Sequence, residues 1–256
     1  MSGIDINCDM GESPEAIVDG TQEVLMRYIT SCNIACGGHA GDENTMRATV
    51  EQAMRHKVAI GAHPGYADRE NFGRAVLRIT EKEIADSVFQ QIQRLAGIAA
   101  ECGAQITHVK AHGALYNQAA REPAIARAIA EGVSRWNKTT VLVGLAGSRM
   151  LDVFRNAGFK IAAEAFADRR YEPDGSLRSR KFDDALITDP AQAAAQALGI
   201  AQRGIVTALN GVEIPIDAQT ICIHSDTPDA QHIAAAVAAK LRNARITLRS
   251  IGAASS

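Results

Sequence analysis

Histidine, lysine and carboxylate side chains recur in this sequence directly after short apolar runs, where they could carry out acid–base chemistry. His63, Lys110 and His112 can donate or accept protons or act as cations, and Asp9 can act as a general base. The polar residues gathered after these runs are Asn7, Asp9, Glu12, His39, Asp42, His63, Lys110, His112, Tyr116, Glu164, Asp168, Arg170 and His224. Such a concentration predicts an enzyme site rather than a chain built only to fold.

Residues 107–112 alternate in a way that places His108, Lys110 and His112 on one face of a predicted strand. In a barrel this face would be the lumen, where a buried lysine must pair with an acid or lose its proton. We therefore expect Lys110 and His112 to be functional. A histidine at a strand end is more often a structural group, and this alternative applies most to His108, which lies deeper in the strand.

One carboxylate and two histidines, namely Asp9, His39 and His63, form a reasonable set of ligands for a divalent ion. The spacing is not diagnostic, and hydrogen bonding explains these residues equally well. The sequence contains neither the glycine-rich phosphate loop that ends in Gly-Lys-Ser/Thr nor the Gly-x-Gly-x-x-Gly fingerprint. If the protein uses ATP, it does not bind it with a P-loop.

Short apolar runs alternate with longer helical patterns along the chain. The predicted strands are 4–8, 31–36, 58–62, 106–111, 140–145, 160–164 and 220–224. The predicted helices are 43–56, 80–102, 123–136, 147–157, 190–203 and 227–243, and the second opens with the capping box Thr80-Glu81-Lys82-Glu83. This order indicates a mostly parallel sheet covered by helices, as a closed barrel or an open sheet. In both cases the polar residues would meet at the carboxyl edge of the strands.

Two segments interrupt the alternation of strands and helices. Residues 167–184 are charged and rich in turn formers, which makes them a candidate lid or contact segment. Residues 206–216 carry Asn210-Gly211 between apolar flanks, which predicts a β-hairpin.

The composition is that of a globular protein, with 256 residues, 46% hydrophobic and 22% charged, and we expect one domain over 1–256. The net charge of −2 provides no basic excess for nucleic acid. No apolar run approaches the roughly 20 residues that span a bilayer, and the first residues show no export signal. Five scattered cysteines do not form a disulfide framework, so we expect a cytoplasmic protein.

Seven long blocks of this sequence resemble the LamB/YcsF family, the A subunits of prokaryotic 5-oxoprolinase. They run in the family's order through most of the chain. The blocks are 7–12 (NCDMGE), 33–42 (NIACGGHAGD), 60–66 (IGAHPGY), 108–117 (HVKAHGALYN), 143–148 (VGLAGS), 164–171 (EAFADRRY) and 221–228 (ICIHSDTP).

The resemblance implies an α/β fold, namely a seven-stranded parallel (β/α) barrel similar to the glycoside hydrolase/deacetylase fold. It also implies ATP-dependent opening of 5-oxo-L-proline (pyroglutamate) to L-glutamate, with ATP and Mg²⁺ as co-substrate and subunits B and C as partners. The absence of a P-loop suggests that phosphorylation takes place on those partners. The metal-binding deacetylases of this fold class carry an Asp and a His-x-x-x-His pair. This sequence lacks the pair after its second strand, so a metal is not carried over from the resemblance, and whether the protein binds one stays open.

Within this hypothesis Asp9 or His63 is the base, Lys110 and His112 stabilise charge, and Arg170 clamps the substrate carboxylate. The other predicted substrate-binding residues are Asn7, Glu12, His39, Asp42, Tyr116, Glu164, Asp168 and His224. Two alternatives stay open. One is a metal-dependent amide or ester hydrolase, such as a deacetylase, that acts alone. The other is a non-catalytic sugar- or metabolite-binding protein, for which an aromatic content of 4% offers little stacking surface.

Overall fold

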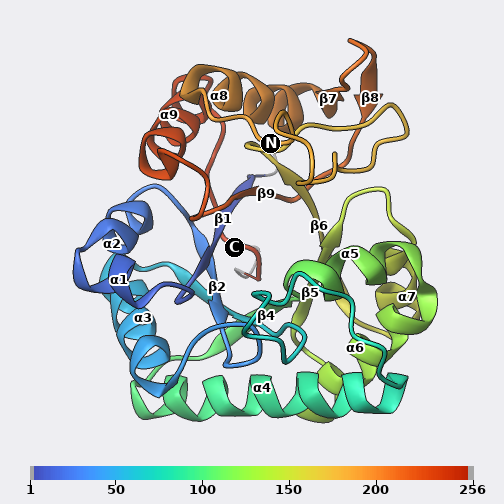
Figure 1. Cartoon of the computed structure of the whole chain (residues 1–256). Coiled ribbons are helices and arrows are strands. Elements are labelled where there is room, and N and C mark those ends of the chain that lie inside the picture. The colour runs from blue at the N-terminus through green and yellow to red at the C-terminus, as the bar shows by residue number, and fades with distance from the viewer. Residues whose placement is uncertain (1–2, 253–256) are drawn as a thin grey trace.

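Seven parallel strands close into a barrel at the centre of the molecule (Figure 1). The computed structural model describes residues 3–252, so the ends of the predicted 1–256 domain, residues 1–2 and 253–256, lie outside the described residues; the expected absence of an export signal rests partly on residues 1–2. The barrel strands are β1 (Asp5–Met10), β2 (Ser31–Ala35), β3 (Ala59–His63), β4 (Ile106–Lys110), β5 (Val141–Leu145), β6 (Lys160–Phe166) and β9 (Thr220–Ile223).

Strand β9 closes the barrel because it pairs with both β6 and β1. Thr220 lies opposite Glu164 on one side and opposite Asp5 on the other. The structure therefore confirms the seven-stranded parallel barrel and excludes the open sheet that periodicity alone left possible.

Helices surround the barrel, with α4 along one side and α8 and α9 along the opposite one (Figure 1). The helices are α1 (Pro14–Val18), α2 (Thr21–Met26), α3 (Glu43–His56), α4 (Glu81–Glu101), α5 (Gly113–Arg121), α6 (Pro123–Trp136), α7 (Arg149–Asn156), α8 (Pro190–Leu198) and α9 (Ala230–Asn243), and a π-helical turn (Gly199–Arg203) follows α8. The predicted helices are confirmed, and the predicted capping box of Thr80 and Glu83 starts α4. The short helices α1, α2 and α5 were not predicted from the sequence.

Polar side chains fill the lumen of this barrel, in contrast to the branched apolar layers common in larger (β/α) barrels. The Asn33 amide donates to both Asn7 and Asp9, and the His108 ring contacts Asn33 at 3.0 Å. Gly61 makes room for the His108 ring, since a Cβ at this position would overlap it. Apolar residues that alternate with the lumen residues, such as Ile6, join a buried cluster with the helices. The barrel thus has a polar interior and an apolar outer shell.

The two interrupting segments lie on the β6–β9 side of the barrel. Strands β7 (Ile205–Thr207) and β8 (Glu213–Pro215) form an antiparallel pair, which confirms the predicted hairpin around Asn210-Gly211. The segment that follows β6 makes isolated bridges, among them Tyr171 with Leu177, and contains neither a helix nor a longer strand up to residue 189.

The five cysteines are all free thiols. In the part of the chain that the structure describes, no helix has both the length and the apolar character needed to cross a membrane.

Candidate active site

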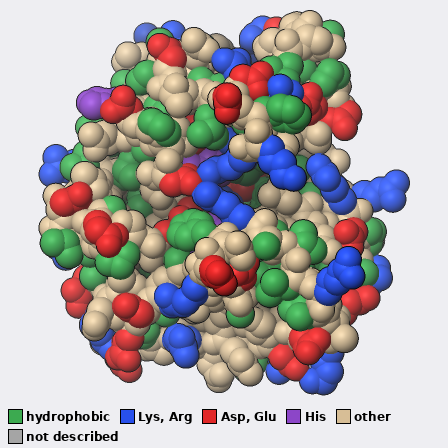
Figure 2. Space-filling view, viewed as in Figure 1, with side chains coloured by type: hydrophobic (Ala, Val, Ile, Leu, Met, Phe, Trp, Pro, Cys, Tyr) green, Lys and Arg blue, Asp and Glu red, His purple; other side chains and the backbone are tan. Residues whose placement is uncertain are grey.

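A cavity of about 570 Å³ lies at the carboxyl end of the barrel strands. Figure 2 shows a hollow near the centre of this face, where basic, acidic and histidine side chains meet. Asp9 comes from β1, His63 from β3 and Lys110 from β4, and all three line the cavity. The structure thus brings together residues that are more than a hundred positions apart in the sequence.

Lys110 stands at the base of this cavity and is only 3% exposed. Its ammonium lies 3.0 Å from Asp9 Oδ1, 2.8 Å from Glu164 Oε1 and 3.2 Å from Asn7 Oδ1. Burial alone would lower the pKa of Lys110, but the adjacent carboxylates hold it well above its ordinary value. Lys110 is therefore a fixed positive charge, and of the two alternatives for a buried lysine the structure has the pairing with acids.

Glu164 connects Lys110 to the next layer of polar groups. It accepts hydrogen bonds from Asn7 Nδ2 at 3.0 Å and from the Tyr116 hydroxyl at 2.7 Å. Burial and the Glu164 charge raise the pKa of Tyr116 well above its ordinary value. The hydroxyl consequently keeps its proton and holds Glu164 in place.

Three histidines and Glu12 form a second cluster beside Asp9. His63 Nε2 lies 3.3 Å from Asp9 Oδ2 and 3.0 Å from His112 Nδ1. His39 stacks on His112, with ring centroids 3.6 Å apart and planes inclined by 4°, and its Nε2 lies 2.9 Å from Glu12 Oε1. We refer to Glu12, His39, His63 and His112 as the histidine cluster.

Opposing effects set the protonation of these groups. Burial alone would raise the pKa of Asp9, but His63 and Lys110 lower it well below its ordinary value. Burial alone would also raise the pKa of Glu12, but its contacts with His112 and His39 lower it below its ordinary value. Burial lowers the pKa of His39 to about 4. Asp9 and Glu12 are therefore anions at neutral pH, while the His39 ring is neutral.

Asp168 and His224 form a third group of polar residues, at the edge of the cavity. The Asp168 carboxylate accepts from the His224 backbone N–H and lies 3.0 Å from the His224 ring Nδ1. It also accepts from the Thr227 hydroxyl at 2.6 Å. Although burial opposes the shift, His224 lowers the pKa of Asp168 to about 2. This carboxylate fixes the orientation of the His224 ring.

Arginines also line this cavity, and they differ from the one that the sequence predicted. Arg169, only 7% exposed, lines the cavity, whereas Arg170 is not among the lining residues. The chain bends at residues 167–168, so strand alternation does not carry through to this pair. Arg74 and Arg180, which were not predicted as site residues, both pair with Asp226 at the rim.

The predicted site residues other than Arg170 fall into three groups. Those lining the cavity are Asp9, Glu12, His63, Lys110, His112, Tyr116 and His224. Those held against lining residues by hydrogen bonds are Asn7, His39, Glu164 and Asp168. Asp42 lies elsewhere, because its carboxylate caps α3 by accepting from the Thr45 backbone N–H.

The structure divides the predicted metal set between two groups of possible ligands. Among the described residues, Glu12, His39, His63 and His112 each offer one ligand atom, and these atoms lie within 4.8 Å of one another. Asp9 instead groups with Cys222 and His224.

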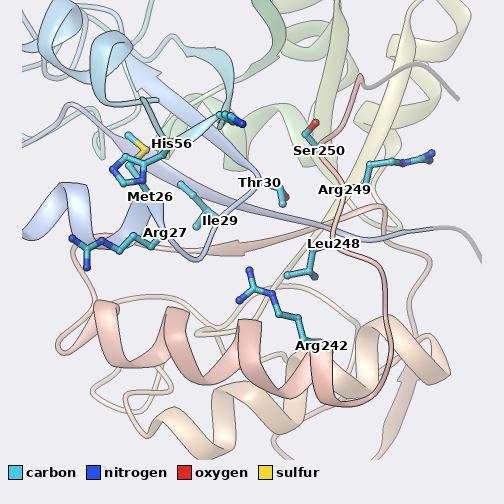
Figure 3. A pocket seen from close by; sticks show the side chains of 10 residues that line it. Met26, Arg27, Ile29, Thr30, His56, Arg242, Leu248, Arg249 and Ser250 are labelled. Carbon is cyan, nitrogen blue, oxygen red and sulfur yellow. The ribbon is translucent and has the colours of Figure 1, made fainter. Parts of the chain in front are cut away.

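A second cavity has a volume of about 560 Å³ (Figure 3). Thr30 and Lys57, which come just before β2 and β3, line it, so it lies at the amino end of the barrel. Its lining includes Arg27, Lys57, Arg242 and Arg249, and none of the carboxylates between residues 3 and 252 lines it. Because this cavity lacks paired acids and bases, the carboxyl-end cavity is the candidate active site.

The fold and the site together define the class of the protein: a parallel (β/α) barrel with a buried acid–base site at the carboxyl end of its strands. Comparison with known proteins narrows this class. The model of the LamB/YcsF family matches residues 4–256, and the chain belongs to this family.

Curated relatives carry a consistent name, that of the A subunit of 5-oxoprolinase. The relative of this name from Chloroflexus aggregans is 48% identical over 249 residues, which cover 97% of this chain and 99% of the relative. The relative of the same name from Bordetella pertussis is 50% identical over 227 residues, which cover 89% and 90%. The crystal structure of the lactam utilization protein from Thermus thermophilus is 37% identical, has a TM-score of 0.91, and covers 98% of this chain and 100% of its own.

Proposed function

We propose that this chain is the A subunit of an ATP-dependent 5-oxoprolinase, which opens the lactam of 5-oxo-L-proline to give L-glutamate. The buried contact of Lys110 with Asp9 and Glu164 at the base of the cavity carries this proposal. A fixed cation beside a carboxylate base suits a reaction that develops negative charge on a carbonyl oxygen while water attacks. The names of the relatives supply the substrate class.

The chemistry follows from the stability of the lactam amide. Resonance makes its carbonyl carbon a poor electrophile, so the lactam oxygen first takes the γ-phosphoryl group of Mg²⁺-bound ATP, with release of ADP. Water adds to the resulting imidate-like carbon, and the C–N bond of the ring breaks as the nitrogen takes up a proton. The acyl phosphate that remains reacts with a second water to give glutamate and inorganic phosphate.

Residues of the cavity supply the groups that these steps need. Asp9 or His63 takes the proton from water, and both lie in the cavity 3.3 Å from each other. Lys110 and His112 stabilise the charge on the oxygen or its phosphate. Arg169 replaces Arg170 as our candidate clamp for the substrate carboxylate, because it lines the cavity.

We assign the phosphorylation step to partner subunits, B and C, since this chain has no P-loop. The relatives are named as one lettered component of 5-oxoprolinase, which is consistent with a multi-subunit enzyme. The rim segment 177–181, which carries Arg178, Arg180 and Lys181, is our candidate contact surface for the phosphates or the partners.

Glutamate release from 5-oxoproline and ATP, measured with and without the partner subunits, tests this function. We expect turnover only in the reconstituted complex, and a loss of at least about 100-fold in Lys110→Met. Lys82→Met, at a side chain 83% exposed, is the matched control and should retain activity. Robust ATP-dependent turnover by the chain alone would refute the division of labour. Ring opening by the chain alone without ATP would favour a hydrolase that acts by itself.

A further inference from the structure

Two ring nitrogens face each other inside the histidine cluster. His63 Nδ1 lies 2.8 Å from the Lys110 carbonyl oxygen, and His112 Nε2 lies 2.9 Å from the Phe72 carbonyl oxygen. A carbonyl oxygen only accepts hydrogen bonds, so each of these two nitrogens must carry a hydrogen. In neutral rings, His63 Nε2 and His112 Nδ1 are then without hydrogen, and they lie 3.0 Å apart. Two lone pairs at this distance repel each other, and a positive charge between the two nitrogens would remove this repulsion.

The carboxylates around this space indicate the size of the charge. Glu12 Oε1 lies 3.2 Å from His112 Nδ1, and Asp9 Oδ2 lies 3.3 Å from His63 Nε2. Among the described residues, Lys110 is the one Lys or Arg ion-paired with Asp9 or Glu12, and Glu164 shares it. Two buried carboxylates, Asp9 and Glu164, therefore share one ammonium, and the partly buried Glu12 carboxylate has, within residues 3–252, only histidine rings beside it. Since uncompensated buried charge is costly, a dication satisfies this site better than a single proton.

We infer that Glu12, His63 and His112 bind a divalent transition-metal ion. Imidazole nitrogen with one carboxylate suits Zn²⁺ and similar ions. The Lys110 and Phe72 carbonyls provide what metal-binding histidines usually have, namely an acceptor for the second N–H that fixes the tautomer and the ring orientation.

His39 acts as a positioning residue in this arrangement and not as a ligand. Its ring lies parallel to that of His112 at 3.6 Å, so the in-plane lone pairs of the two rings do not converge on one ion. Its Nε2–H instead donates to Glu12 Oε1 at 2.9 Å and holds that carboxylate toward the site. The ligand set thus differs from the one predicted from sequence by including Glu12 and His112 in place of Asp9 and His39.

The catalytic role of the ion rests on the proposed function, whereas the inference that the site binds an ion rests only on the geometry of its residues. A divalent ion held by Glu12, His63 and His112 would lower the pKa of a water molecule in the cavity, which is the chemistry that attack on the activated lactam carbon needs. With Nε2 as a ligand and Nδ1 bonded to the Lys110 carbonyl, His63 would have no nitrogen free to take a proton, and Asp9 would be the base. Metal binding by His63 would therefore leave Asp9, and not His63, as the base in the proposed reaction.

Metal binding is measurable without any reaction. The whole chain, stripped with a chelator, is titrated with Zn²⁺ by calorimetry and with Co²⁺ by its visible absorption. We expect one ion per chain, and affinity reduced by more than about 100-fold in Glu12→Gln and in His112→Gln. His39→Gln should lose about 10- to 100-fold as a positioning residue. His232→Gln, at a side chain 67% exposed, is the control for loss of a histidine and should bind normally.

Several outcomes would overturn the inference. If the native chain does not bind one Zn²⁺ or Co²⁺ per chain, the positive charge between the two rings is a shared proton and not a metal ion. Affinity lost in His224→Gln but retained in both Glu12→Gln and His112→Gln would place the ion with Asp9 and Cys222. Thermal unfolding of each variant shows that it is folded. Binding with the expected variant pattern, but without ring opening by the complex, would support the metal site and refute the proposed function.

Discussion

Removal of the Lys110 charge is the most informative perturbation of the buried site. In Lys110→Met, the carboxylates of Asp9 and Glu164 lose an ammonium that lies 3.0 and 2.8 Å away. Breaking a buried ion pair by removing one partner costs about 3–5 kcal/mol, a large part of the roughly 5–15 kcal/mol that stabilises a typical domain. We therefore expect urea unfolding at pH 8 to show a loss of stability in this range.

The pH dependence of this loss has a definite sign. The Lys110 charge lowers the pKa of Asp9 in the folded state, and such a contribution is present above the unfolded pKa and disappears on acidification. Without the charge, the folded protein takes up a proton at Asp9 more readily. The difference between native and Lys110→Met protein should thus be larger at pH 8 than at pH 5.

A double mutant separates the charge effect from lost packing. Glu164→Gln replaces one of the two stranded carboxylates by a neutral amide, so Lys110→Met/Glu164→Gln should be more stable than the sum of the single effects predicts, by about 1–3 kcal/mol. Lys82→Met should change stability by no more than about 0.5 kcal/mol, since this lysine is exposed. Additivity of the Lys110 and Glu164 changes within about 0.5 kcal/mol, together with equal losses at both pH values, would refute the electrostatic reasoning.

Three further changes test other parts of the structure. Tyr116→Phe removes a hydroxyl that donates to a buried carboxylate, and should cost about 1.5–3 kcal/mol in urea unfolding and reduce glutamate release. Burial raises the pKa of Asp5 from 3.8 to about 6, so its contribution to stability is present below pH 4 and lost as the pH rises through 6. Asp5→Asn should therefore remove up to about 3 kcal/mol of the change in stability between pH 4 and 7. Gly61→Ala should cost about 1–3 kcal/mol because its Cβ overlaps the His108 ring, whereas Gly97→Ala, in open space on α4, should stabilise the protein by about 0.5–1 kcal/mol.

Local sequence patterns predicted most of the strands and helices and many of the residues that line the carboxyl-end cavity. Alternation correctly placed His108 and Lys110 in the lumen, and strand ends correctly brought Asp9, His63 and Lys110 to one cavity. Closure of the barrel depends on the pairing of the first and last strands, which are about two hundred residues apart, and no local pattern encodes it.

The residues that sequence reasoning misplaced depend on local bends and on tertiary contacts. Arg169 rather than Arg170 enters the cavity because the chain bends after β6. Asp42 follows a glycine-rich loop in the same way as the site residues do, but its carboxylate caps α3. The role of the Phe72 carbonyl beside His112 was not predictable, because it depends on a loop that crosses the carboxyl face of the barrel.

The most direct test of the account is the position of 5-oxoproline in a crystal of the chain grown with this compound. We predict the lactam ring in the carboxyl-end cavity, with its carbonyl oxygen within hydrogen-bond distance of Lys110 and its carboxylate beside Arg169. Ordered 5-oxoproline in the basic cavity at the amino end of the barrel, with the Lys110 cavity holding only water, would show that the active site lies elsewhere.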